Sequence, residues 1–310
     1  MSEQPGMALG EYPTTLPSPQ LLRDVAVLRP NDLHHALTLL DEAQRAGQAL
    51  RPMAGCTDLL VEAHFGKPMP AQVLDLWALR HSLGTLQWTE RGLRIGALAT
   101  YRTALQDPRF CAELPALAKA ASLVGATQIQ ARGTFAGNVE NASPAADAAP
   151  MLMALDASVE LTSLRGVREL PLHSYYLGYR RTVRMPDEII TSLLIPADRL
   201  GHPGQWLRKV GTRAYQAITK VGLAGVFSWQ DGLLQDVSLV AVSMAATPLR
   251  CFAMEGYLRH KSLSDLDPIG LRQAQARDLT PIDDVRSTAD YRAEVFARLV
   301  EQALRETAAT

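Results

Sequence analysis

The sequence predicts an α+β protein built from several compact units. A β-α-β pattern begins the chain, strands and helices alternate through its middle, and from about residue 201 three strands precede three helices. A run of strands followed by helices is typical of an antiparallel sheet backed by helices. The chain has 310 residues, of which 47% are hydrophobic, and this is enough for two or three units with their own cores.

The N-terminal part is predicted to hold a leader, a strand and a helix. Prolines among glycine, serine and threonine, without apolar periodicity, predict a flexible or extended leader over residues 1–20. Residues 22–28 predict a short strand. Asn31 is predicted to cap a helix whose apolar residues recur at helical spacing, and Gly47 is predicted to end it.

A second strand, a tight turn and a helix start are predicted over residues 50–61. The helix would begin near Thr57 or Asp58, either of which could cap it. A strand that enters a helix through small residues is a ready phosphate site, but it is also an ordinary β-α turn. A strand at residues 73–76 completes a unit of β-α-β character over about residues 21–85.

The middle of the chain, about residues 86–200, is predicted to mix strands and helices. Alternating or mostly apolar runs predict the strands, and apolar stripes at helical spacing predict the helices. The strands are expected at residues 93–97, 159–164 and 189–195, and the helices from Thr100, at 114–124 and at 150–155.

Residues 201–310 are predicted to form an antiparallel sheet backed by helices. The strands are expected at residues 206–212, 221–229 and 237–244. Asp231-Gly232 between the last two strands is a strong hairpin signal. Thr247-Pro248 is predicted to open a helix, and the last helix is expected from Ala289 to about Arg305.

One stretch, residues 132–147, contains unusually many small residues. It reads Arg-Gly-Thr-Phe-Ala-Gly-Asn-Val-Glu-Asn-Ala-Ser-Pro-Ala-Ala-Asp. A backbone that lies against a ligand needs such residues, because a missing Cβ allows close approach and successive N–H groups can form an anion-binding concavity. The alternative, which the stretch alone does not exclude, is a Gly/Ala turn that leads into a helix.

Composition narrows the possible functions. The net charge of −1 predicts no general attraction to nucleic acid or to anionic membranes. No apolar run approaches the ~18 residues of a membrane span, and no secretory signal is recognisable, so we expect a cytoplasmic protein. Cys56, Cys111 and Cys251 lack Cys-x-x-Cys spacing, which argues against a disulfide framework and against a zinc or iron–sulfur site within the chain.

Common catalytic and nucleotide-binding motifs are absent from the sequence. It contains no Gly-x-Gly-x-x-Gly after a strand, no Walker A motif, no His-Glu-x-x-His and no Gly-x-Ser-x-Gly. No acid–base pair stands out, so we predict neither a catalytic side chain nor a metal ligand. If the protein is an enzyme, a bound cofactor is expected to carry the reactive group.

Two small-residue turns, roughly 80 positions apart, would suit a ligand with a pyrophosphate between them. At these turns the sequence resembles the FAD-binding medium subunit of the molybdenum hydroxylases, the xanthine dehydrogenase and carbon monoxide dehydrogenase group. Ala-Gly-Cys-Thr-Asp-Leu at 54–59 matches the family's Ala-Gly-Gly-Thr-Asp-Leu. Residues 128–138 match its Gln-Ile-Arg-Asn-x-Gly-Thr-Ile-Gly-Gly-Asn, and residues 143–147 match its Ser-Pro-Ala-Ala-Asp.

The resemblance implies a two-subdomain PCMH-type FAD-binding domain over residues 21–200, with subdomains at about 21–85 and 86–200. A C-terminal flavoprotein domain would follow at residues 201–310. Backbone N–H groups of the two turns would wrap the FAD pyrophosphate. The residues concerned are Ala54, Gly55, Cys56, Thr57, Asp58, Leu59, Leu60, Thr134, Ala136, Gly137 and Asn138.

Four further positions carry roles that the resemblance implies. Asn141 and Asp147 would hydrogen-bond the ribityl chain, the ribose or the adenine side of FAD. Ile190 would pack on or near the isoalloxazine ring. Lys209 would approach the flavin ring, where a cation would stabilise a reduced, anionic flavin. The alternative for Lys209 is a solvated lysine on a strand.

Gln130-Ala131 stand where the family has Arg-Asn, at the exit of a helix, and two glycine positions of the family signatures are also replaced. Cys56 stands at the second glycine of the first signature, and Ala136 at the first glycine of the Gly-Gly pair. Each adds a Cβ where the backbone is expected to meet phosphate. If either position needs a positive φ, the cost is about 1 kcal/mol. Both glycine replacements bear on how tightly FAD is held.

The resemblance implies an electron-transfer subunit of an oxidoreductase. A large subunit would hold the molybdopterin cofactor, and a small subunit would carry two [2Fe–2S] clusters that pass electrons to the FAD of this chain. NAD+ or another acceptor would receive them, and the complex would be a dimer of heterotrimers. The alternatives are a stand-alone FAD-dependent oxidoreductase and a scaffold subunit that has lost FAD.

Overall fold

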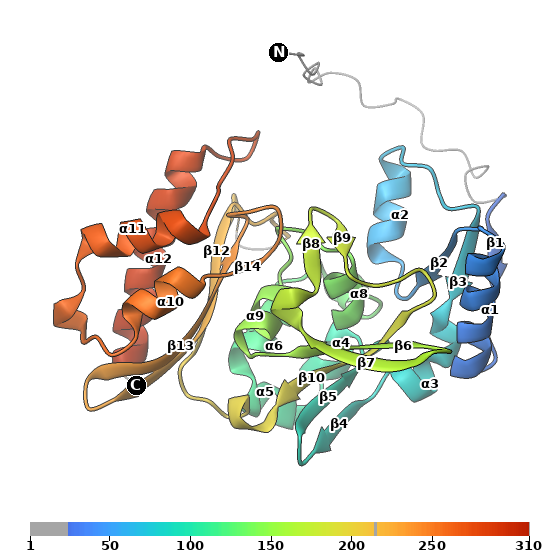
Figure 1. Cartoon of the computed structure of the whole chain (residues 1–310), viewed down its shortest axis with the longest axis horizontal. Helices are drawn as coiled ribbons and strands as arrows, with labels where there is room; N and C mark the ends of the chain where they lie inside the picture. Colours follow the sequence, from blue (N-terminus) through green and yellow to red (C-terminus); the bar gives the residue numbers. More distant parts are fainter. Residues whose placement is uncertain (1–23, 214–215, 310) are drawn as a thin grey trace.

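The computed structural model describes residues 24–213 and 216–309. Three main sheets lie in a row, with the N-terminal sheet at one end and the C-terminal sheet and its helices at the other (Figure 1). The predicted α+β class is confirmed. The leader predicted over residues 1–20 lies outside the described residues, as do the first two residues of the strand predicted at 22–28.

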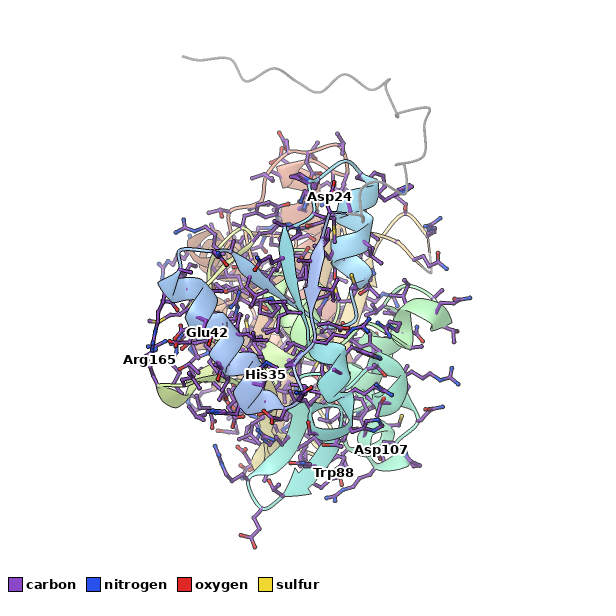
Figure 2. All side chains as sticks on the ribbon, turned by 90° about the vertical axis from the view of Figure 1, so that its right-hand side faces the viewer. Asp24, His35, Glu42, Trp88, Asp107 and Arg165 are labelled. Atoms are coloured by element: carbon purple, nitrogen blue, oxygen red, sulfur yellow. The ribbon has the colours of Figure 1, made fainter. Side chains whose placement is uncertain are left out.

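The N-terminal unit is a three-stranded parallel sheet with helices on both faces. Its elements are β1 (Ala26–Leu28), α1 (Leu33–Arg45), β2 (Leu50–Met53), α2 (Thr57–His64) and β3 (Gln72–Asp75), with strand order β1-β3-β2. The crossover through α1 runs from one edge strand to the other, and the crossover through α2 returns to the centre. Right-handed crossovers in opposite directions put the helices on opposite faces, as Figure 2 shows. The predicted β-α-β character is confirmed.

The cap predicted for α1 is wrong by one residue. Asp32, not Asn31, is the N-cap, and its carboxylate accepts a hydrogen bond from the N–H of His35 at 2.8 Å. The His35 Nδ1 in turn accepts from the N–H of Asn31 at 3.2 Å. Both Asn and Asp favour N-caps, and the reciprocal contact with His35 decides between the two neighbours.

The middle unit is a five-stranded antiparallel sheet of order β4-β5-β10-β6-β7. The strands are β4 (Leu86–Thr89), β5 (Gly92–Gly96), β6 (Ser158–Ser163), β7 (Gly166–Pro171) and β10 (Ile189–Pro196). Alternate residues such as Leu93, Val159 and Leu193 are completely buried against the helices that separate β5 from β6 in sequence. The three predicted strands are present; β4 and β7 were not predicted.

Seven short helices lie between β3 and β6, the first of them, α3, at the end of the N-terminal unit. They are α3 (Arg80–Leu83), α4 (Tyr101–Leu105), α5 (Pro108–Glu113), α6 (Pro115–Ser122), α7 (Thr127–Gln130), α8 (Phe135–Glu140) and α9 (Ala149–Ala154). Thr100 caps α4 as predicted, because its hydroxyl accepts from the N–H of Thr103 at 3.0 Å. A two-stranded hairpin, β8 (Tyr176–Gly178) and β9 (Arg181–Thr182), follows the sheet strand β7.

The C-terminal unit is an antiparallel sheet of order β11-β12-β13-β14. Its elements are β11 (Gln205–Val210), β12 (Val221–Gln230), β13 (Leu233–Val242), β14 (Leu249–Arg250), α10 (Phe252–Leu258), α11 (Pro268–Asp278) and α12 (Ala289–Ala308). Asp231 and Gly232 form the predicted hairpin turn, with φ angles of 52° and 76°. Two successive positive φ angles are those of a type I′ turn.

The prediction that Thr247-Pro248 opens a helix is wrong. Leu249 instead pairs with Ala241 in the sheet, and α10 begins at Phe252. The carboxylate of Asp278, at the end of α11, accepts hydrogen bonds from two N–H groups in the first turn of α10 at 3.0 and 2.9 Å. Because this cap comes from a distant helix, no local pattern reveals it.

The C-terminal sheet is covered on both faces. One face packs on α10, α11 and α12 around Phe227, Phe296 and Val300. The other face contributes residues such as Ala224 and Val240 to the core of the middle unit. Among the described helices, none has the length and apolar character needed to cross a membrane.

Candidate functional site

A cavity of about 900 Å³ lies between the N-terminal and middle units. Its walls come from β2 and α2 on one side and from α4, α8 and β10 on the other (Figure 1). Ligand and cofactor pockets commonly measure about 300–1,000 Å³. The cavity therefore has the size expected for a large organic cofactor.

Nearly all the residues that the sequence indicated for a cofactor meet in this one cavity. The lining includes Ala54, Gly55, Cys56, Thr57, Asp58, Leu59, Thr134, Ala136, Gly137, Asn138, Asn141, Asp147 and Ile190. Leu60 and Lys209 are not among the lining residues. Leu60 is 48% exposed on the outer side of α2.

The two small-residue turns pack directly against each other. A Cβ built on Gly55 would lie 1.8 Å from the carbonyl oxygen of Arg132 and 3.2 Å from the nitrogen of Gly133. No side chain fits in this space, so glycine is required at position 55 for the two backbones to meet. The two turns thus form one continuous wall of the cavity.

The N-terminus of α2 opens toward the cavity without a side-chain cap. The predicted caps are wrong: Thr57 and Asp58 lie inside the helix, and Cys56 occupies the N-cap position with a φ of 64°. The Cys56 side chain makes no capping hydrogen bond. The first N–H groups of the helix therefore remain for a ligand, and such groups favour anions.

The second turn is organised around the short helix α8. Thr134 is its N-cap, and its hydroxyl accepts from the N–H of Gly137 at 3.0 Å. Ala136 lies within α8, where an ordinary helical backbone makes no demand for a positive φ. Of the two replaced glycines of the family signatures, only the one at Cys56 therefore carries the backbone cost of the left-handed conformation.

The polar residues of this wall already have protein partners. The Asn138 side-chain oxygen accepts from the N–H of Ala149 at 3.0 Å, at the start of α9. The Asn141 side-chain oxygen accepts from Arg180 Nη1 at 2.8 Å. These contacts fix the orientation of both amides, so that the NH₂ group of each is available as a donor.

Lys209 forms an ion pair with Asp147, at 2.8 Å between Nζ and Oδ1. The lysine side chain is only 13% exposed, so it is not a solvated strand lysine. Thr219 donates to the same carboxylate at 3.2 Å. Burial raises the pKa of Asp147, and Lys209 and Thr219 counteract this shift. Lys209 thus reaches the cavity wall through Asp147.

Charged side chains at the cavity were missed by the sequence reasoning. Arg180, at the tip of the β8–β9 hairpin, forms an ion pair with Glu62 of α2, from the opposite wall. Arg184 contacts Glu140 of α8 at 2.7 Å. No motif surrounds these arginines, and their partners lie 118 and 44 positions away in the chain, so no sequence signal marked them.

A buried carboxylate pair anchors the strand that carries Ile190. Arg165 bonds to Asp187 at 2.9 Å, and Arg168 bonds to Glu188 at 2.7 and 2.8 Å. Burial alone would raise the pKa of Glu188, but Arg168 lowers it overall. These pairs tie the β6–β7 hairpin to the start of β10 and so position Ile190, which is only 5% exposed, at the cavity.

Comparison with known families identifies this architecture. The model of the FAD binding domain in molybdopterin dehydrogenase matches residues 23–198, and that of the CO dehydrogenase flavoprotein C-terminal domain matches residues 206–307. The chain belongs to this FAD-binding family. The resemblance inferred from the two turns is confirmed, and the chain is an oxidoreductase subunit of the xanthine and CO dehydrogenase type.

Individual relatives agree with this assignment. The chain is 26% identical over 278 residues to a putative xanthine dehydrogenase FAD-binding subunit of Escherichia coli K12, covering 89% of this chain and 95% of the relative. It is 32% identical over 219 residues to the nicotinate dehydrogenase FAD-subunit of Eubacterium barkeri, covering 67% and 73%. A chain of the reconstituted CO dehydrogenase from Oligotropha carboxidovorans superimposes with a TM-score of 0.84 at 25% identity, covering 92% and 98%.

The residues present fit the FAD that membership of this family implies. The backbone approach at Gly55, the uncapped start of α2 and the cavity volume are each what a diphosphate-containing cofactor needs. Within the described residues, no group of three or more His, Cys, Asp or Glu side chains is placed to hold a metal ion.

Proposed function

We propose that the chain is the FAD-binding electron-transfer subunit of a molybdenum-containing hydroxylase or dehydrogenase. The observation that carries the proposal is the single cavity in which both signature turns meet. When bound, FAD supplies the redox chemistry that the side chains of the cavity do not provide. The chain itself binds the cofactor, orients it and shields it from water.

The cofactor site is proposed from the residues that line this cavity. Residues at the starts of α2 and α8 line it. The uncapped N–H groups at the start of α2, together with those of α8 other than the Gly137 N–H, which donates to the Thr134 hydroxyl, would hold the diphosphate. The amides of Asn138 and Asn141 and the carboxylates of Asp58 and Asp147 would bind the sugar and ribityl hydroxyls. Ile190 would contact the flavin ring. Lys209 would act on the cofactor through the carboxylate of Asp147.

The proposed complex includes two further subunits. A large subunit would hold the molybdopterin cofactor, a small subunit would hold [2Fe–2S] clusters, and NAD+ or another acceptor would take the electrons. Relatives named as the carbon monoxide dehydrogenase medium chain and as a subunit of the 6-hydroxypseudooxynicotine dehydrogenase complex support a multisubunit enzyme. A dimer of heterotrimers is the assembly that we propose, and the cytoplasm is the proposed location.

The domain division is proposed to follow the three sheets. The FAD-binding domain would occupy residues 21–200, in subdomains of about 21–85 and 86–200, and the C-terminal domain residues 201–310. The support is that the three clusters of buried apolar residues centre on the three sheets. The N-terminal cluster also includes Leu98 and Ile189 of the middle unit, and the middle cluster includes residues of the C-terminal sheet such as Ala224.

The visible spectrum of the purified chain tests the proposal. We expect a flavin spectrum, either as purified or after addition of FAD, and extraction of FAD rather than FMN. Co-purification with a molybdenum subunit and an iron–sulfur subunit is expected when the chain is isolated from its native source. A colourless protein that takes up no added FAD would overturn the proposal, and full dehydrogenase activity of the lone chain would favour a stand-alone enzyme.

A further inference from the structure

Tyr101 is a buried tyrosine in the wall of the cavity, at the first position of α4. Its residue is only 2% exposed. In the described part of the chain, residues 24–213 and 216–309, its hydroxyl makes no hydrogen bond to a protein atom, and it is not among the side-chain atoms that are fully buried without a partner. The small exposed part of this cavity-lining residue therefore includes the hydroxyl. A hydroxyl that has no protein acceptor and is accessible from a cavity can donate to a ligand bound there.

The ring of Tyr101 is held firmly in place. Its N–H donates to the carbonyl of Gly133 at 3.2 Å, and it packs edge-to-face on Phe135 with 4.8 Å between ring centroids. A Cβ added to Gly133 would lie 3.0 Å from the ring atom Cε2. The ring therefore lies directly beneath the second signature turn, and it cannot swing away to find another partner.

The charges around Tyr101 keep its hydroxyl protonated. Burial raises the pKa of Tyr101 well above its usual value, and the carboxylates of Asp58 and Asp147 raise it further. Both carboxylates line the same cavity. The hydroxyl is therefore a neutral donor at any working pH, placed between the start of α2 and the end of the second signature.

The neighbouring tyrosines show that this position is distinctive. The hydroxyl of Tyr175 donates to the carboxylate of Glu140. The hydroxyl of Tyr176 is fully buried without a partner within the described residues, and Tyr176 is not part of the cavity lining. Of these three tyrosines, only Tyr101 both lines the cavity and has a hydroxyl without a protein acceptor.

We infer that Tyr101 donates a hydrogen bond to an oxygen of the ribityl–diphosphate chain of the bound FAD. The inference rests on the proposed function, since it requires FAD in this cavity. The position supports this part of the cofactor, because Tyr101 lies under the turn at Gly133 and opposite the N-terminus of α2. These are the two backbone segments proposed to hold the diphosphate.

The test compares FAD binding by the wild-type chain, Tyr101→Phe and Tyr176→Phe, through quenching of flavin fluorescence. The Tyr101→Phe Kd is expected to rise about two- to tenfold, the usual value of one hydrogen bond. The matched control Tyr176→Phe, which loses a hydroxyl without a partner outside the cavity lining, is expected to bind FAD like the wild type. Equal affinities for Tyr101→Phe and the wild type would overturn the inference.

Thermal unfolding separates binding from folding. Without FAD, Tyr101→Phe is expected to unfold at the wild-type temperature or slightly above, because the hydroxyl that it lacks makes no protein contact. With saturating FAD, its gain in melting temperature is expected to be smaller than that of the wild type. A lower melting temperature without FAD and an unchanged gain with FAD would mean a purely structural role and would also overturn the inference.

ADP, used as a second probe, locates the acceptor on the cofactor. If Tyr101→Phe weakens both ADP and FAD, the hydroxyl bonds to the diphosphate; if it weakens FAD alone, the hydroxyl bonds to the ribityl chain. Both results support the inference. If the wild-type chain itself binds no FAD, the proposed function fails, and this result differs from wild-type binding with an unchanged Tyr101→Phe affinity.

Discussion

Cys56 is one of three non-glycine residues at or beside the cofactor site with a positive φ; the others are Ala142 and Arg180. The φ of 64° at Cys56 lies in the left-handed region, which glycine adopts freely and other residues adopt at a cost. The related signature has glycine here, and this chain keeps the backbone conformation with a side chain added. Burial raises the pKa of the Cys56 thiol, so the thiol is not activated as a nucleophile. The residue acts through its backbone.

We expect Cys56→Gly to stabilise the protein. Removal of the Cβ relieves the cost of the left-handed backbone. Glycine also raises the entropy of the unfolded chain, which offsets part of this effect, so the free energy of unfolding should rise by roughly 0.5–1 kcal/mol. Thermal unfolding without FAD should show a higher midpoint. The same change at Cys111, inside α5, should lower the midpoint, because glycine costs about 1 kcal/mol in a helix. A lower midpoint for Cys56→Gly would contradict the argument.

Asn138→Leu is expected to weaken FAD binding about tenfold, because leucine offers no polar group to the cavity. It also removes the hydrogen bond to Ala149 and should lower stability. The control is Asp107→Leu, which removes the cap of α5 at the end of the molecule opposite α2 (Figure 2). The control should lower stability but leave the FAD Kd unchanged. Parallel titration and melting curves measure both effects, and unchanged affinity for Asn138→Leu would refute the assigned position.

At the scale of elements, the cavity depends on contacts between segments that are remote in sequence. The β8–β9 hairpin reaches α2 through Arg180 and Glu62, and Arg180 also holds Asn141. Within the described residues, no other ion pair joins residues 24–85 to the rest of the chain. The hairpin and α2 therefore form a connection between the two walls of the cavity.

Arg180→Gln should speed the release of FAD. The ion pair is partly exposed, so its loss is worth at most about 1 kcal/mol, or roughly a fivefold faster dissociation at low salt. Glu62→Gln should have a similar effect, and high salt should reduce the difference from wild type. Arg91→Gln breaks a similar pair with Glu169 away from the cavity and serves as the control. Stopped-flow displacement of FAD gives the rates, and a wild-type rate for both Arg180→Gln and Glu62→Gln would exclude this role.

At the scale of the whole molecule, the C-terminal unit closes the back of the cofactor site. Lys209 pairs with Asp147, and the N–H of Ser243 donates to the carbonyl of Pro144 at 2.9 Å. The end of the second signature is thus bound to the C-terminal sheet by a charge pair and by backbone contact. The cavity residue Asp147 cannot shift without affecting the packing between the two units.

Lys209→Met is expected to destabilise the protein by about 3 kcal/mol, because it leaves a nearly buried carboxylate unpaired. The folded-state pKa of Asp147 is already raised, and loss of Lys209 raises it further. A carboxylate with a raised folded-state pKa costs stability at neutral pH, and this cost disappears as the pH falls below the unfolded pKa. The deficit relative to wild type should therefore shrink on acidification from about pH 7 to about pH 5.

Denaturant unfolding of wild type and variant at the two pH values measures this trend. The double variant Lys209→Met, Asp147→Asn should recover much of the lost stability at neutral pH, because the amide carries no charge to bury. A deficit that is independent of pH, or a double variant no more stable than Lys209→Met, would show that the lysine acts through packing and not through its charge.

The sequence alone was sufficient for features that depend on local backbone chemistry. The type I′ turn at Asp231-Gly232, the cap at Thr100 and the parallel N-terminal unit follow from residue type and spacing. The family was also recognisable from its signatures at 54–59 and 132–147. Small residues recur in these signatures because a backbone that approaches a ligand closely has no room for large side chains. Glycine at position 55 is one such requirement, and it can be read directly from the chain.

Only the tertiary structure decided which side chains meet at the cavity. It placed Tyr101 beneath Gly133, Arg180 opposite Glu62, and Asp147 between the cavity and Lys209. It also showed that Cys56, and not Ala136, takes the left-handed backbone. These contacts join residues that lie tens of positions apart in the chain. The packing of whole sheets and helices sets their geometry, so no local pattern of residue types predicts these contacts.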